Sequence, residues 1–117
     1  MQIQVNTDNH IENTAKLTNY VESIIHDSLE RFHRRITSVH VHLTDENGGH
    51  KSGSNDKRCV MEARVSGRQP ITVTADAPSV DQALSGAITK LEKLLTSTFD
   101  KLDQAKGRPS MAGEETP

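Results

Sequence analysis

The feature that most constrains the fold of this chain is a long apolar stripe in its C-terminal half. Apolar side chains recur every three or four positions at Val80, Leu84, Ala87, Ile88, Leu91, Leu95 and Leu102. This spacing predicts an amphipathic helix that ends at about residue 104. Ser79-Val80-Asp81-Gln82 matches a capping box that would begin this helix. Because only one side of the helix is apolar, a second layer of structure must cover that side.

Four shorter segments alternate apolar and polar residues, which is the pattern of strands with one buried face. They lie at residues 2–6, 36–43, 59–65 and 71–75. The short turn Ser66-Gly67-Arg68 joins the last two, so strands two to four can form a meander. Pro70 has no backbone N–H to donate, which favours an edge position or the start of a strand for it.

A second amphipathic helix is predicted over residues 15–32, with the Thr14 hydroxyl as its N-cap. The whole order predicts an α+β fold, β-α-β-β-β-α, with a four-stranded sheet and two helices packed on one face. We expect residues 1–104 to form a single domain. The Gly-rich, polar residues 44–56 are expected to be a loop. Residues 105–117, which are rich in Gly and Pro, are expected to be a disordered C-terminal tail.

Composition limits the size of the core and the cellular compartment in which the protein can work. Hydrophobic residues make up 32% of the chain and aromatic residues 3%, so the core must be small and built mainly from aliphatic side chains. No apolar run is long enough to cross a membrane, and the N-terminus does not have the pattern of a secretory signal. Cys59 is the only cysteine, so no internal disulfide can form. These features predict a cytoplasmic protein with Cys59 as a small core residue.

Charge is unevenly distributed along the chain. The formal net charge is −2, yet cations are concentrated in residues 31–68, whereas residues 1–30 are acidic. Three arginines cluster at the end of the first predicted helix: Arg31, Arg34 and Arg35. Three lysines share a stripe of the second predicted helix, away from its apolar side: Lys90, Lys93 and Lys101. The pattern indicates a basic patch on a mildly acidic protein.

Three sets of residues occur in the order in which a known family carries them. They are Ile11–Thr14 with Leu17, Tyr20 and Val21; then Ile36–Leu43; then Ala83, Ala87, Ile88, Lys90–Lys93 and Asp100–Leu102. In this order they resemble the start of the first helix, the second strand and the second helix of the short ribosome hibernation-promoting factors and ribosome-associated inhibitors. The resemblance covers about residues 1–104.

The resemblance implies a cytoplasmic protein that binds the small ribosomal subunit, through 16S rRNA, in the channel between head and body. There it would overlap the places of mRNA and tRNA and inhibit translation under stress. An rRNA groove is read mainly through shape and phosphates, so cations on one face are required. The rRNA-binding residues implied here are Lys90, Lys93, Lys101, Arg31, Arg34 and Arg35. Ser97 and Phe99 stand where relatives usually carry lysine, and the outer side of the first helix is acidic, so this basic surface is thinner.

Other interpretations remain open at this point. A diverged relative with this acidic first helix could bind a protein partner instead of rRNA. His40 and His42 point to the same side of a strand and could share a metal with His50 or Glu62. No phosphate-binding glycine loop, metalloprotease motif or nucleophile elbow is present, so we expect no enzyme, no cofactor and no metal. We expect no DNA or membrane partner and a monomer, although an exposed strand edge could allow self-association.

Overall fold

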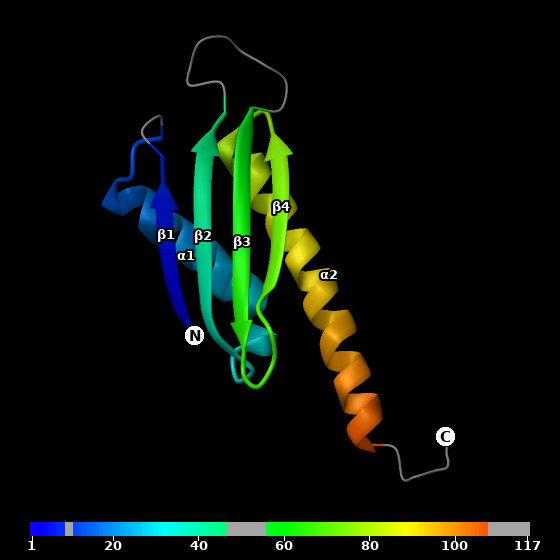
Figure 1. The fold of residues 1–117 in the computed structure, drawn as a ribbon. Coiled ribbons are helices and arrows are strands. Elements are labelled where there is room, and N and C mark those ends of the chain that lie inside the picture. Colours follow the sequence, from blue (N-terminus) through cyan, green and yellow to red (C-terminus); the bar gives the residue numbers. More distant parts are fainter. Residues whose placement is uncertain (9–10, 47–55, 108–117) are drawn as a thin grey trace.

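The computed structural model describes residues 1–8, 11–46 and 56–107, and its elements follow the predicted order (Figure 1). The elements are β1 (Gln2–Thr7), α1 (Ala15–Leu29), the 3-10 turn η1 (Glu30–Phe32), β2 (Ile36–Asp45), β3 (Lys57–Val65), β4 (Ile71–Ala77) and α2 (Val80–Gly107). The predicted α+β fold of β-α-β-β-β-α order is therefore confirmed.

The four strands lie in the order β1-β2-β3-β4. β1 runs parallel to β2 because α1 connects them as a crossover, whereas β2, β3 and β4 form the predicted antiparallel meander. In this register Val5, Val41, Met61 and Val73 lie side by side across the sheet. All four are buried, which shows that this side of the sheet faces the core.

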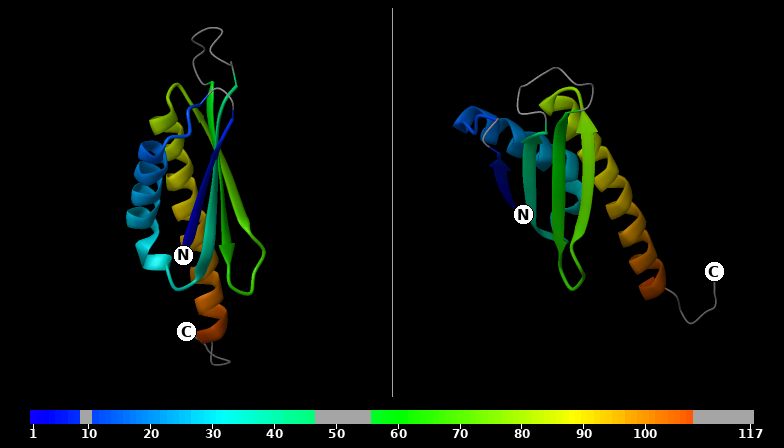
Figure 2. Two further views of the ribbon diagram at one scale, coloured as in Figure 1. Left: turned by 90° about the vertical axis from the view of Figure 1, so that its left-hand side faces the viewer. Right: turned by 45° about the horizontal axis from the view of Figure 1, so that its top comes forward.

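Both helices cover the same face of the sheet, and Figure 2 shows the opposite face uncovered. The alternation along β2 explains this arrangement, since Val39, Val41 and Leu43 are fully buried while His40 and His42 face the uncovered side. The apolar stripe of α2 completes the core at Leu84, Leu91 and Leu95. The prediction of one sheet with both helices on one face is confirmed.

Side-chain caps begin both helices where the sequence indicates. The Thr14 hydroxyl accepts a hydrogen bond from the Leu17 amide at 3.1 Å. The Ser79 hydroxyl accepts one from the Gln82 amide at 3.1 Å, and it also lies 3.2 Å from the side-chain oxygen of Gln82. α2 continues to Gly107 instead of ending near 104. The remainder of the predicted tail, residues 108–117, and most of the predicted loop, residues 47–55, lie outside the described residues.

Side chains connect α2 to the region of α1 at two places, one near each end of α1. At its start, the Tyr20 hydroxyl donates a hydrogen bond to the Asp81 carboxylate at 2.5 Å, which raises the pKa of Tyr20. Just after its end, the ring of Phe32 in η1 packs against the ring of Phe99, with centroids 5.5 Å apart. Both rings are buried, so the Phe pair closes the lower end of the core. Beyond this pair, α2 projects past the end of the sheet (Figure 1).

Candidate nucleic-acid interface

A shallow groove of about 730 Å³ runs along the outer side of α2, next to η1. We call it the helix groove. Its lining residues are Arg31, Thr89, Glu92, Lys93, Thr96, Ser97, Asp100, Lys101 and Gln104. The groove therefore collects three of the six predicted rRNA-binding residues: Arg31, Lys93 and Lys101. These residues come from segments more than sixty positions apart, so the fold brings them together.

Arg31 is held at one side of the helix groove by contacts with α2 and with the Phe32 ring of η1. Its guanidinium donates a hydrogen bond to the Thr96 hydroxyl of α2 at 2.9 Å. The same group lies over the Phe32 ring, 4.6 Å from the centroid. Both contacts leave other N–H donors of the guanidinium available, since that group carries five. Arg31 is thus an exposed cation in a defined position.

Lys93 and Lys101 line the same groove, and both side chains are exposed. Within the described parts of the chain, neither ammonium group forms an ion pair or hydrogen bond. Glu92 and Asp100 also line the groove, so its charge is mixed. Electrostatic attraction for phosphates is therefore weaker than three cations alone would give.

Lys90 shares the lysine stripe but lies beside the edge of the sheet instead of lining the helix groove. Its ammonium group donates a hydrogen bond of 2.7 Å to the backbone carbonyl of Thr74 in β4. β4 is an edge strand, so this contact ties α2 to the edge of the sheet. The structure therefore gives Lys90 a role inside the fold.

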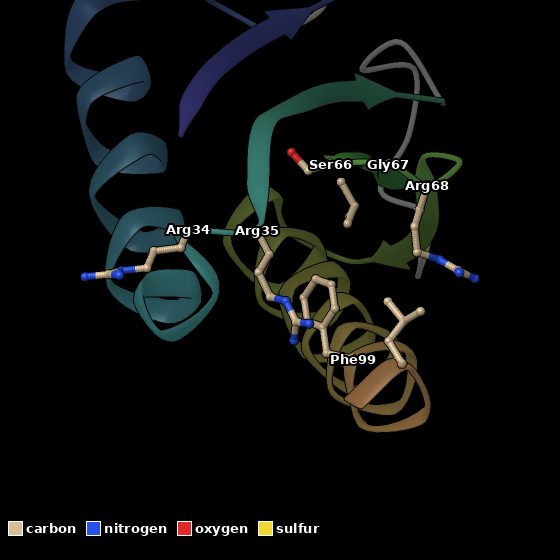
Figure 3. Close-up of a pocket in the computed structure, with 8 residues that line it drawn as sticks. Arg34, Arg35, Ser66, Gly67, Arg68 and Phe99 are labelled. Carbon is tan, nitrogen blue, oxygen red and sulfur yellow. The ribbon is translucent and has the colours of Figure 1, made fainter. Parts of the chain in front are cut away.

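A second concave surface, of about 490 Å³, lies where the start of β2, the β3–β4 turn and α2 meet (Figure 3). We call it the arginine depression. Its lining residues are Arg34, Arg35, Val65, Ser66, Gly67, Arg68, Phe99 and Leu102. Of the predicted residues, Arg34 and Arg35 meet here, apart from the helix groove. Arg68 joins them from the β3–β4 turn.

Arg35 is fixed at the base of this depression. Its guanidinium makes two hydrogen bonds to the Asp103 carboxylate, at 2.8 and 3.3 Å, and lies 4.3 Å from the centroid of the Phe99 ring. The hydrogen bonds to Asp103 raise the pKa of Arg35. Part of its charge is therefore already neutralised within the protein. Arg34 and Arg68, in contrast, have exposed side chains.

His40 and His42 both lie on the uncovered face of the sheet, with Glu62 opposite His40 in the register. Within residues 1–8, 11–46 and 56–107, no group of three or more His, Cys, Asp or Glu side chains is placed to hold a metal ion. His50, the other residue considered as a ligand, lies outside this range. The geometry of the described residues therefore does not support a metal site at His40 and His42.

Two cations at the start of β3 are paired with acids. Lys57 lies 3.2 Å from Asp56 and 3.5 Å from Asp45, and the hydrogen bond to Asp56 is the largest cause of its raised pKa. Arg58 pairs with Asp76 at 2.8 Å, and this hydrogen bond raises its pKa as well. These cations hold strand ends together.

Cys59 behaves as the predicted core residue. It is fully buried on β3, and burial raises the pKa of its thiol to about 12. A thiol in that state is a poor nucleophile.

None of the helices in the described part of the chain combines the length and apolar character that a bilayer-spanning helix requires.

The fold and these surfaces define a class of protein: a small α+β domain with an uncovered polar sheet face and cationic surfaces at the ends of its helices. The family described as sigma 54 modulation protein / S30EA ribosomal protein matches residues 3–103. The chain belongs to this family of ribosome-associated proteins. The resemblance in the sequence motifs is therefore confirmed.

Two solved structures are similar in fold. A ribosomal subunit interface protein from Coxiella burnetii superposes with a TM-score of 0.67 at 16% identity, covering 86% of this chain and 99% of that one. The N-terminal domain of protein Y from Thermus thermophilus superposes with a TM-score of 0.65 at 19% identity, covering 84% and 99%. At this level of identity both show a shared fold. A search among curated protein sequences gave no match.

Proposed function

We propose that this protein binds the small ribosomal subunit in its mRNA and tRNA channel and so inhibits translation under stress. The observation that carries the proposal is the convergence of Arg31, Lys93 and Lys101 on one groove of the molecular surface. Three exposed cations on a concave surface suit the phosphates of an rRNA groove. Family membership and the two fold neighbours, named for the ribosomal subunit interface and as protein Y, support a ribosomal partner.

The mechanism that follows is steric. A rigid domain lodged in the channel would occupy space that mRNA and tRNA need, and it would leave when growth resumes. This requires no bond to be made or broken, and the family is one of modulation proteins, typically non-enzymatic. We therefore propose a non-enzymatic protein that needs no cofactor and acts in the cytoplasm, where ribosomes are.

The six proposed rRNA contacts differ in what they can offer. Arg31, Lys93 and Lys101 lie together, and Arg34 is exposed in the neighbouring depression. Lys90 and Arg35 already bind groups of the protein itself. Replacing either of these two should therefore lower affinity for the subunit less than replacing Lys93 or Lys101.

The test is a competition on purified small subunits at low salt. The chain should pellet with empty subunits, and subunits loaded beforehand with mRNA and initiator tRNA should pellet much less of it. Equal pelleting with loaded and empty subunits would place the protein outside the channel. No pelleting with either would refute ribosome binding. Arg64→Gln, on the uncovered face of the sheet, is a control with one cation removed that should behave as the unchanged chain.

A second candidate function is binding of a protein partner, and the acids of the helix groove favour it. Glu92 and Asp100 line that groove beside the cations, and mixed charge is common where proteins meet proteins. A ribosome interaction that added salt leaves unchanged, or its absence, would support this alternative.

A further inference from the structure

The arginine depression has a chemical character of its own, distinct from that of the helix groove. Its floor combines the apolar side chains of Val65, Phe99 and Leu102 with the Arg35 guanidinium, which lies over the Phe99 ring, and its rim carries Arg34 and Arg68. Leu102 is partly exposed there. A surface that pairs an apolar floor with cations on its rim suits a ligand with a flat apolar part and an anionic part.

The rim cations come from different elements and frame the depression on opposite sides. Figure 3 shows Arg34 and Arg68 extended away from each other, with Arg35 against Phe99 between them. Within the described residues, the side chains of Arg34 and Arg68 form no hydrogen bond or ion pair. Long, unpaired side chains can turn toward an anion at little cost, since no existing bond must break.

The base of the depression, in contrast, is rigid. The Arg35 guanidinium is fixed by two hydrogen bonds to Asp103 and by its position over the Phe99 ring. The β3–β4 turn is also defined: the Ser66 amide donates to the Arg35 carbonyl at 3.1 Å, and Gly67 takes a φ of 73°. That conformation favours glycine, and it sets the position of Arg68 beside the depression. The site is thus a fixed floor with two movable cations.

We propose that the arginine depression binds a nucleotide. The base would lie against Val65 and Leu102, and the phosphate would be held by Arg34 and Arg68. Of the ligands with a flat ring and a phosphate, nucleotides are the class that a ribosome-associated protein meets, either as free mononucleotides or as unstacked residues of RNA. Guanidinium groups suit phosphate because they present paired N–H donors to its oxygens.

This inference goes beyond ribosome binding, because it concerns a ligand that the isolated chain would hold. The volume of about 490 Å³ lies within the range of small-molecule sites. The charge of the depression also favours an anion. Three arginines line it, and Asp103 pairs with one of them, Arg35. The same ligand chemistry can come from the cellular nucleotide pool or from RNA, and the test separates these sources.

The experiment is a titration of the labelled, ribosome-free chain followed by NMR of its backbone amides. The probes are adenosine 5′-monophosphate, adenosine, inorganic phosphate, a penta-glutamate peptide and a short oligoadenylate. The monophosphate or the oligoadenylate should shift the amides of Ser66, Gly67, Arg68 and Leu102. Adenosine and phosphate alone should bind at least about tenfold more weakly, because each lacks one of the two contacts.

Variants localise the ligand. Arg68→Gln and Arg34→Gln should each weaken binding at least about fivefold, the loss expected for one charge-assisted hydrogen bond to phosphate. Arg64→Gln lies outside the depression and should leave binding unchanged. Binding of both nucleotide probes would support a site open to free nucleotides, and binding of oligoadenylate alone would support a site for RNA.

Three results would overturn the proposal. One is the absence of shifts at these amides with every nucleotide probe. Another is binding of inorganic phosphate or penta-glutamate as tight as that of the nucleotides, which would show a general anion patch. The third is nucleotide binding that Arg34→Gln and Arg68→Gln leave intact. Because no ribosome is present in this titration, its outcome is separate from that of the pelleting experiment.

Discussion

Replacing Phe99 by alanine tests whether the end of the core is built as described. Phe99 is 4% exposed and packs against Phe32 with ring centroids 5.5 Å apart. Truncation of a buried Phe to Ala costs about 3–5 kcal/mol, while the better helix propensity of Ala returns about 0.5 kcal/mol. The site borders the surface, where solvent can fill part of the space, so the lower end of the range applies. We expect the free energy of unfolding to fall by about 3 kcal/mol.

Urea unfolding followed by circular dichroism measures this change, with Phe99→Leu as the control. Leucine keeps an apolar side chain at the position and should lose less than half as much stability as alanine. Phe99→Lys should be at least as destabilising as Phe99→Ala, because it places a charge where the ring is buried. A loss below about 1 kcal/mol for Phe99→Ala, within the range of a surface substitution, would refute the placement of this ring in the core.

The remaining predictions concern a thiol, a close helix–strand contact and a strand edge. The folded chain should react with a thiol reagent only after unfolding. Stability should fall as pH rises from 9.0 toward 12, because the unfolded state then loses the thiol proton of Cys59 first. Gly86→Val should lower the unfolding free energy by about 2 kcal/mol, since a Cβ there meets the Ala75 Cβ at 3.2 Å. Gly86→Ala should be near neutral in the same urea assay, as a helix-propensity gain of about 1 kcal/mol offsets that contact. Lys90→Ala should increase self-association in sedimentation velocity, because it exposes the edge carbonyl of Thr74; an unchanged monomer fraction would contradict this role.

Local sequence patterns predicted most of the fold. The alternation in residues 36–43 and 59–65 and the stripe that begins at Val80 are short-range signals of burial. The structure buries the apolar side chains of these segments, with Val80 and Leu102 only partly buried. The caps at Thr14 and Ser79 were equally local. The burial of Phe99 was not predicted. Phe99 stands where relatives usually carry lysine, and the predicted apolar stripe did not include it. Its ring is buried against Phe32 of η1, which the fold brings close to α2.

The candidate site was less predictable, for a physical reason. Helical spacing placed Lys90, Lys93 and Lys101 on one stripe, but it could not show that Lys90 reaches across to β4. Nor could it show that Arg35 is held by Asp103, or that Arg68 lies in the same depression. All three relations join residues distant in sequence, so they depend on how α2 crosses the sheet.

The salt dependence of small-subunit binding tests the central claim most directly. It should be measured for the unchanged chain, for Lys93→Gln and for the triple variant R31Q/K93Q/K101Q, in which glutamine keeps part of each side-chain stem. Each phosphate contact contributes about 0.7–0.9 to the slope of log K against log salt, so the triple variant should have a slope smaller by about 2–3. Arg64→Gln, the matched single-charge control, should keep the full slope. Equal slopes for the unchanged chain and the triple variant would contradict the account, because the helix groove would then bind no rRNA phosphate.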